Sequence, residues 1–134
     1  MFVLDTNVVS ELRRARPHGA VLAWLKSVDD SRLYLSAVTI GEIQRGIEVT
    51  REANPSRARE LQRWLAEVED AWNVLPMTAA CFRRWAEMTH RRPAAQAMDA
   101  MIAATAAVHG FGVATRNIKD FKPFGVDLVD PFAG

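Results

Sequence analysis

Phe2-Val3-Leu4-Asp5-Thr6-Asn7 is a short apolar run that ends on an acid. An apolar run of this length predicts a buried strand. Ligands of parallel α/β sheets bind beyond the carboxyl ends of the strands, so an acid in the place of Asp5 faces the binding site. Asp is also a preferred helix cap, so Asp5 could instead only cap a helix predicted over residues 7–13.

Four further apolar runs predict strands of the same sheet. They cover residues 33–35, 74–75, 112–115 and 126–129. Stretches with a helical period lie between these runs. The alternation predicts an α/β fold in which helices cover both faces of a central, mostly parallel sheet of about five strands.

Three helices are predicted with particular clarity. One follows Asn54-Pro55, where Asn can cap a helix and Pro suits its first turn. Its apolar face consists of Ala58, Leu61, Leu65, Val68 and Trp72. A second helix follows Thr78 and ends near Pro93. A third, over residues 99–108, is apolar nearly all round and closes at His109-Gly110, which predicts a buried central helix.

Length and composition predict one domain. The chain has 134 residues, of which 49% are hydrophobic, so residues 1–134 can bury a single core. The single cysteine, Cys81, cannot form an internal disulfide. No basic leader and no stretch of roughly 18 apolar residues is present, so we expect a cytoplasmic protein. The net charge of +1 does not by itself indicate nucleic-acid binding.

Three more acids are predicted near the same edge of the sheet. Glu42 follows the second predicted strand, although Thr39-Ile40-Gly41-Glu42 also matches a capping box that would use Glu42 only within its own helix. Asp99 stands at the head of the apolar helix, where an unpaired charge would be desolvated. Asp120 follows the fourth strand, and with Asn117 before it could belong to an ordinary capped turn.

Carboxylates that gather at one edge of a sheet require a counter-charge, because they repel each other at a few ångströms. Mg²⁺ and Mn²⁺ take hard oxygen ligands, so the sequence predicts a divalent metal site formed by Asp5, Glu42, Asp99 and Asp120. The scattered histidines and the lone cysteine do not suggest zinc. The chain also has no P-loop and no G-x-S-x-G nucleophile elbow, which leaves metal-assisted hydrolysis.

Four motifs resemble, in order and spacing, those of PIN domains of the VapC type. They lie at residues 2–7, 36–46, 99–106 and 115–121, and the likeness extends over residues 1–132. Two departures are visible. Met98 stands where the family often has proline, and Asp130 stands where Asn is common. Neither departure involves the predicted ligands.

The resemblance implies a PIN-like three-layer α/β/α sandwich. It further implies an endoribonuclease that is the toxin of a VapBC-type toxin–antitoxin pair and forms a homodimer, with RNA as substrate and an antitoxin as partner. By matching positions, Asp5 and Asp99 resemble the principal ligands of Mg²⁺ (or Mn²⁺), while Glu42 and Asp120 complete the acidic catalytic pocket or hold metal-bound waters. The supporting polar groups implied are Thr6, Thr115 and Asn117.

We expect a metal-bound water to attack the scissile phosphate while a carboxylate orients it or accepts its proton. Arg116 and Lys119 lie beside the acids in the sequence and are candidates for binding the RNA backbone. One alternative is a haloacid-dehalogenase-like phosphatase, which usually has a second Asp two residues after its nucleophile, where this chain has Asn7. Another is a noncatalytic binding module with the PIN fold.

Overall fold

A parallel sheet forms the centre of the protein. The computed structural model describes residues 1–133. Its strands are β1 (Phe2–Leu4), β2 (Leu33–Ser36), β3 (Asn73–Leu75), β4 (Gly112–Ala114) and β5 (Leu128–Val129). They lie in the order β3-β2-β1-β4-β5, with parallel pairing throughout. The predicted five-stranded parallel sheet is confirmed, with strand ends shifted by one or two residues.

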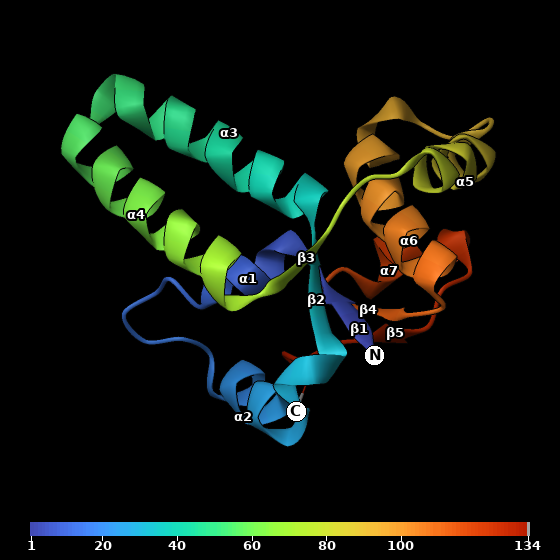
Figure 1. The fold of residues 1–134 in the computed structure, drawn as a ribbon, viewed down its shortest axis with the longest axis horizontal. Helices are drawn as coiled ribbons and strands as arrows, with labels where there is room; N and C mark the ends of the chain where they lie inside the picture. Colours follow the sequence, from blue (N-terminus) through green and yellow to red (C-terminus); the bar gives the residue numbers. More distant parts are fainter. Residues whose placement is uncertain (134) are drawn as a thin grey trace.

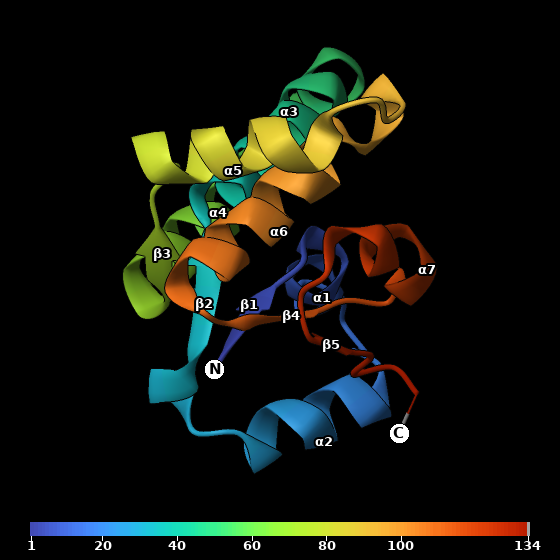
Figure 2. The same cartoon turned by 90° about the vertical axis from the view of Figure 1, so that its right-hand side faces the viewer.

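Helices connect the strands and cover both faces of the sheet (Figures 1 and 2). Within residues 1–133 they are α1 (Thr6–Glu11), α2 (Gly19–Ser27), α3 (Ala37–Ala53), α4 (Pro55–Ala71), α5 (Ala79–Thr89), α6 (Ala97–His109) and α7 (Ile118–Phe121). Short 3-10 turns occupy Asp30–Arg32, Ala94–Gln96 and Lys122–Phe124. None of the helices described is long and apolar enough to cross a membrane.

Alternate strand residues point to opposite faces of the sheet, as the β pleat requires. On one face, Val3 packs against α6 and Phe121. On the other face, Leu4 and Leu35 pack against apolar residues of α1, α2 and α4. All four of these side chains are fully buried. The two helical layers with the sheet between them form the three-layer sandwich that the resemblance implied.

Helices α3 and α4 form a hairpin that extends away from the sheet (Figure 1). Asn54 caps α4 as predicted, because its side-chain oxygen accepts a hydrogen bond from the N–H of Arg57 at 3.1 Å. The predicted apolar stripe of α4 is buried at Ala58, Leu61, Leu65 and Val68. The stripe packs against Ile47 of α3 and, through Val68, against apolar residues of α1 and α2.

The apolar helix α6 is the buried central helix that the sequence predicts. Residues from Ala100 to Ala106 are buried with the exception of Met101, and Gly110 ends the helix with a φ of 71°. The helix begins at Ala97, two residues before the predicted start. Asp99 therefore lies within the first turn of α6 and is not its N-cap residue.

Candidate active site

Asp5 lies directly after β1, at the carboxyl edge of the sheet, and its side chain is almost completely buried. Its Oδ1 accepts a hydrogen bond from the N–H of Thr6 at 2.8 Å, so Asp5 does cap α1, which begins at Thr6. Its Oδ2 accepts two further hydrogen bonds from other side chains. The capping role and the position at the sheet edge are thus both present.

Two polar residues hold Oδ2 of Asp5. The hydroxyl of Thr115 donates to it at 2.8 Å, and Nδ2 of Asn7 donates to it at 3.0 Å. Thr115 follows β4 and is fully buried. Asn7 also accepts a hydrogen bond from the N–H of Arg116 at 3.3 Å, so it ties the end of β1 to the end of β4. The orientation of Asp5 is therefore set by side chains from two neighbouring strand ends.

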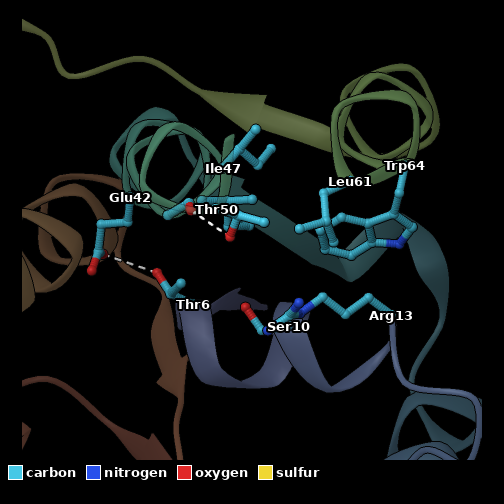
Figure 3. A pocket seen from close by; sticks show the side chains of 10 residues that line it. Thr6, Ser10, Arg13, Glu42, Ile47, Thr50, Leu61 and Trp64 are labelled. Atoms are coloured by element: carbon cyan, nitrogen blue, oxygen red, sulfur yellow. Dashed lines mark hydrogen bonds between the residues drawn. The ribbon is translucent and has the colours of Figure 1, made fainter. Parts of the chain in front are cut away.

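Glu42 contacts the same group of residues through Thr6. The hydroxyl of Thr6 donates to Oε1 of Glu42 at 2.9 Å (Figure 3) and lies 3.1 Å from the hydroxyl of Thr39. The capping-box interpretation of Glu42 is wrong. Ser36 is the N-cap of α3, where its hydroxyl accepts the N–H of Val38 at 3.1 Å, and Glu42 lies in the second turn.

Asp99 is half-buried, and the negative charges of the other three acids act on its carboxyl group. Burial is the main reason that the pKa of Asp99 is raised from 3.8 to about 6, and the charges of Asp5, Glu42 and Asp120 contribute the rest of this rise. No N-cap hydrogen bond is made by the side chain that precedes α6. The carboxyl group of Asp99 is therefore repelled by three other carboxylates, and within residues 1–133 none of the causes of its pKa shift is a cation that would offset this repulsion.

Asp120 is the most exposed member of the group and lies in α7. Asn117 stands before this helix without a side-chain capping bond, and its N–H donates to the hydroxyl of Thr115 at 2.9 Å. The charge of Asp120 contributes to the raised pKa of both Asp5 and Asp99. We call Asp5, Glu42, Asp99 and Asp120 the acidic cluster.

Burial is the main reason that the pKa of Asp5 is raised, and hydrogen bonds from Thr115, Thr6 and Asn7 oppose this rise. Burial also raises the pKa of Glu42, where the hydrogen bond from Thr6 acts in the opposite direction and the charge of Asp5 adds to the rise. The four acids come from segments that follow β1, β2 and β4 or begin α6. The structure thus brings the predicted acids together at one edge of the sheet.

Sequence reasoning missed two polar residues of this site. The sequence alone assigns Asn7 no role in the site, yet its amide donates to Oδ2 of Asp5. Its position two residues after Asp5 could have indicated this contact, because a side chain at that spacing can reach back to hydrogen-bond the carboxylate. The sequence indicates only a capping role for Thr39, although Thr39 shares a helix face with Glu42 three residues later.

The acidic cluster offers the hard oxygen donors that Mg²⁺ and Mn²⁺ take. In the part of the chain that the structure describes, no three acidic, histidine or cysteine side chains are placed to enclose an ion together. Mg²⁺ does not require such a cage, because it keeps several waters and is usually bound by one or two carboxylates together with substrate phosphates. The donor set fits a hydrated ion that a substrate phosphate also contacts.

The two candidate RNA-binding cations belong to segments that also contribute residues to this site, since the N–H of Arg116 donates to Asn7 and Lys119 precedes Asp120. Arg116 and Lys119 are both exposed. The guanidinium of Arg116 lies 4.7 Å from the ring centre of Phe132, which holds the side chain in a cation–π contact. Lys119 belongs to α7 together with Asp120.

Asp99 makes the stability of the metal-free protein dependent on pH. Because its pKa is about 6 in the folded chain and ordinarily 3.8, the folded state holds the proton more tightly than the unfolded state. This stabilising contribution is complete below pH 3.8 and is lost as the pH rises through about 6. We expect the free energy of unfolding of the wild type, measured with urea in a chelator, to fall relative to that of Asp99→Asn as the pH rises from 3.8 through about 6. A rise relative to that variant would contradict this assignment.

Comparison with known proteins identifies the fold family. The family model described as "PIN domain" matches residues 2–124. The chain belongs to the PIN-domain family. It is 39% identical to "VapC ribonuclease Y4jK" of Sinorhizobium fredii, with 98% of each chain covered. It is also 34% identical to "Toxin FitB" of Neisseria gonorrhoeae, covering 98% of this chain and 99% of the relative.

Solved PIN-domain structures agree with these matches. The chain superimposes on the structure described as "Crystal Structure of FitAcB from Neisseria gonorrhoeae" with a TM-score of 0.85 and 33% identity, covering 98% of this chain and 99% of the other. The PIN-domain match gives no support to a haloacid-dehalogenase-like phosphatase. The contact between Asn7 and Asp5 is consistent with this, since the amide cannot serve as the acid/base of that class.

Proposed function

We propose that this PIN-domain chain is a metal-dependent endoribonuclease that acts as the toxin of a toxin–antitoxin pair. The observation that carries the proposal is the gathering of four acids from separate segments at the carboxyl edge of the sheet. Relatives over nearly the full chain are named as a VapC ribonuclease and as a toxin. A phosphodiester carries negative charge, so an acidic cluster needs a cation before it can receive such a substrate.

In this proposal, Asp5 and Asp99 are the principal ligands of a Mg²⁺ or Mn²⁺ ion, and Glu42 and Asp120 complete the site. The bound ion supplies Lewis acidity toward the phosphate and lowers the pKa of water. Asp5 is suited to be a ligand because three hydrogen bonds already orient its two oxygens. Asp99 is suited because burial and the repulsion of the other acids raise its pKa, and a nearby cation would offset both effects by favouring the charged form.

We assign to Glu42 the role of accepting the proton of the attacking water. Its Oε1 is held by the hydroxyl of Thr6, while Oε2 makes no hydrogen bond within residues 1–133. As the water oxygen bonds to phosphorus, Oε2 can accept the proton that the water releases. The bond from phosphorus to the leaving ribose oxygen then breaks, and that oxygen takes a proton from solvent. Thr6 acts here as a positioning residue.

Two cations complete the proposed RNA site. Lys119 is exposed beside Asp120 and can bind a phosphate of the RNA backbone. Arg116 can do the same when its guanidinium leaves Phe132. Neither contact would distinguish one RNA sequence from another, because phosphates are common to all.

The proposed antitoxin would act on the same charges. Solved relatives above 30% identity include the structure described as "Structure of FitAB bound to IR36 DNA fragment", with a TM-score of 0.84. A partner protein that inserts a basic side chain among the four acids would neutralise them in place of metal. Such a complex would leave no room for a catalytic ion and would be inactive on RNA.

The direct test is cleavage of RNA by the purified protein. Total RNA is incubated with the protein in Mg²⁺, in Mn²⁺ or in EDTA, and the newly formed ends are sequenced. We expect new ends only in the presence of a divalent metal. RNA that stays intact under all conditions, while the protein still binds it, would favour the noncatalytic binding module. Cleavage that is unaffected by EDTA would contradict the metal requirement.

Thr115 is expected to strengthen metal binding by Asp5 without touching the ion. Replacing Thr115 with valine keeps the shape of the buried side chain but removes the hydroxyl that donates to Oδ2 of Asp5. We expect the affinity for Mn²⁺, measured by calorimetry, to fall about 10–100-fold, as is usual for a residue that orients a ligand. The pKa of Asp5, followed by carboxyl NMR, should rise further, because the Thr115 hydrogen bond lowers it.

Thr89→Val is the matched control for this experiment. The hydroxyl of Thr89 donates to the carbonyl of Trp85 at 2.8 Å, within α5 and away from the acidic cluster. This variant should bind Mn²⁺ as the wild type does. Equal Mn²⁺ affinity in Thr115→Val and Thr89→Val would show that Thr115 does not position the ligand.

A further inference from the structure

A cavity of about 330 Å³ opens beside the acidic cluster, among α1, α3 and α4. Figure 3 shows Thr6 and Glu42 at one end of it and Arg13 and Trp64 at the other. Its volume falls in the range of small-molecule sites, roughly 300–1,000 Å³. We propose that this cavity binds a base of the RNA next to the scissile phosphate. This inference rests on the proposed ribonuclease function.

The walls of the cavity suit the flat face of a base. Ile47 of α3 and Leu61 of α4 are buried and supply apolar surface. The indole of Trp64 is half-buried and packs against core residues of the α3–α4 hairpin, which limits its movement. Proteins bind unpaired RNA bases by stacking them on aromatic side chains and by hydrogen bonds to their edges.

Polar groups for the edge of a base lie on the same walls. Arg13 is exposed, and in residues 1–133 no carboxylate lies within ion-pair distance of it and its guanidinium makes no hydrogen bond. The hydroxyl of Thr50 donates to the carbonyl of Gly46 at 3.0 Å and keeps its lone pairs for an incoming donor. Ser10 adds a second hydroxyl. The guanidinium group of an arginine can donate two parallel hydrogen bonds to acceptor atoms on the edge of a base or to the oxygens of a neighbouring phosphate.

Charge and continuity favour RNA as the occupant. Glu42 belongs both to the acidic cluster and to the cavity lining, so a strand cleaved at the cluster has its neighbouring nucleotide at the cavity mouth. Arg13 stands at the far end, where it can balance the next backbone phosphate. A stacking surface, a cation and hydroxyls together match the chemistry of one nucleotide.

Gly46 offers a way to close the cavity without disturbing the fold. It lies inside α3 and lines the cavity, and a Cβ added there would meet no heavy atom within 4 Å. Gly46→Leu should therefore fill the cavity, and replacing a glycine inside a helix favours the helix. Gly41→Leu is the matched control, because Gly41 has the same open space in α3 but does not line the cavity.

The first measurement is the cleavage of a pool of RNAs with randomised sequence. For Gly46→Leu we expect KM to rise about 10-fold or more, the loss associated with one stacked base, and the base preference beside the cut to disappear. For Gly41→Leu both should remain as in the wild type. A wild-type KM and preference in Gly46→Leu would overturn the proposal while leaving the nuclease intact.

The second measurement needs no catalysis. The four nucleoside 5′-monophosphates are titrated in EDTA, and the indole N–H resonance of Trp64 is followed by NMR. We expect it to shift in the wild type and in Gly41→Leu but not in Gly46→Leu. Arg13→Gln should weaken the shift, whereas Arg14→Gln should not, because Arg14 does not line the cavity.

The two measurements separate the possible failures. If the wild type does not cut RNA, the proposed ribonuclease function is wrong. If the Trp64 resonance does not shift with any nucleotide, the proposal that the cavity binds a base is wrong, whatever the cleavage result. If Gly46→Leu cuts RNA normally but no longer binds the proposed antitoxin, the cavity is a protein-docking site and the RNA assignment is overturned. Loss of the base preference together with loss of the Trp64 shift would support it.

Discussion

Asp99→Asn is expected to reduce RNA cleavage by at least about 100-fold, beyond the loss seen when a residue only orients a metal ligand. The amide keeps the size of the side chain but cannot carry the negative charge that a divalent ion requires. Asp99 lies in the first turn of the buried helix α6, so its backbone position will not change with the substitution. The measurement is the rate of RNA cleavage at saturating Mn²⁺.

The same variant should be more stable than the wild type in EDTA at pH 7. Its side chain does not ionise, so it escapes the repulsion and desolvation that raise the pKa of Asp99 to about 6. Asp70→Asn is the matched control, since Asp70 is exposed on α4 outside the acidic cluster. Its cleavage rate and stability should match the wild type. Full activity in Asp99→Asn would show that Asp99 is not a ligand of the catalytic metal.

Phe121→Ala is expected to cost about 3–5 kcal/mol of stability, the usual range for deleting a buried aromatic ring. Phe121 is fully buried between the sheet and α6, with its ring edge toward Phe124 at a centroid distance of 6.2 Å. Such a loss is a large part of the roughly 5–15 kcal/mol that stabilises a typical domain. Chemical denaturation in urea measures it directly.

Phe82→Ala is the matched control, because it also deletes an aromatic ring but at an exposed position. Phe82 is 46% exposed on α5 and contacts Trp85 edge to face, so its removal should cost about 1 kcal/mol or less. Because Phe121 follows Asp120 directly, loosening α7 should also lower activity at temperatures where the variant is still folded. Equal destabilisation by the two variants would mean that α7 does not anchor the core.

Local sequence patterns predicted much of the fold correctly. Asn54 caps α4, α5 begins after Thr78 and α6 ends at Gly110, as the residue types indicated. These features depend on neighbouring backbone groups within a few residues, which a sequence displays directly. Strand ends were less accurate, because a strand stops where its partner stops and not where its own apolar run ends.

For Glu42 in the candidate site, the local sequence pattern did not decide the role of the side chain. Its spacing from Thr39 fitted a capping box, but Ser36 starts the helix and leaves both side chains facing Thr6. The choice between the two roles depends on which residue begins α3, and this follows from the end of β2 at Ser36. Two equally good local patterns were therefore decided by the sheet.

By itself the sequence determined the order of strands and helices and the place of each acid just beyond a strand or at the head of a helix. Apolar periodicity is a local property, so these features can be recognised without a partner segment. Only the tertiary structure decided that Thr115 holds Asp5 across 110 residues and that Thr6 holds Glu42 across 36. Only the tertiary structure, likewise, opened a cavity beside the acids. Contacts at such separations exist because helices pack onto a twisted sheet at particular angles, which short-range patterns do not encode.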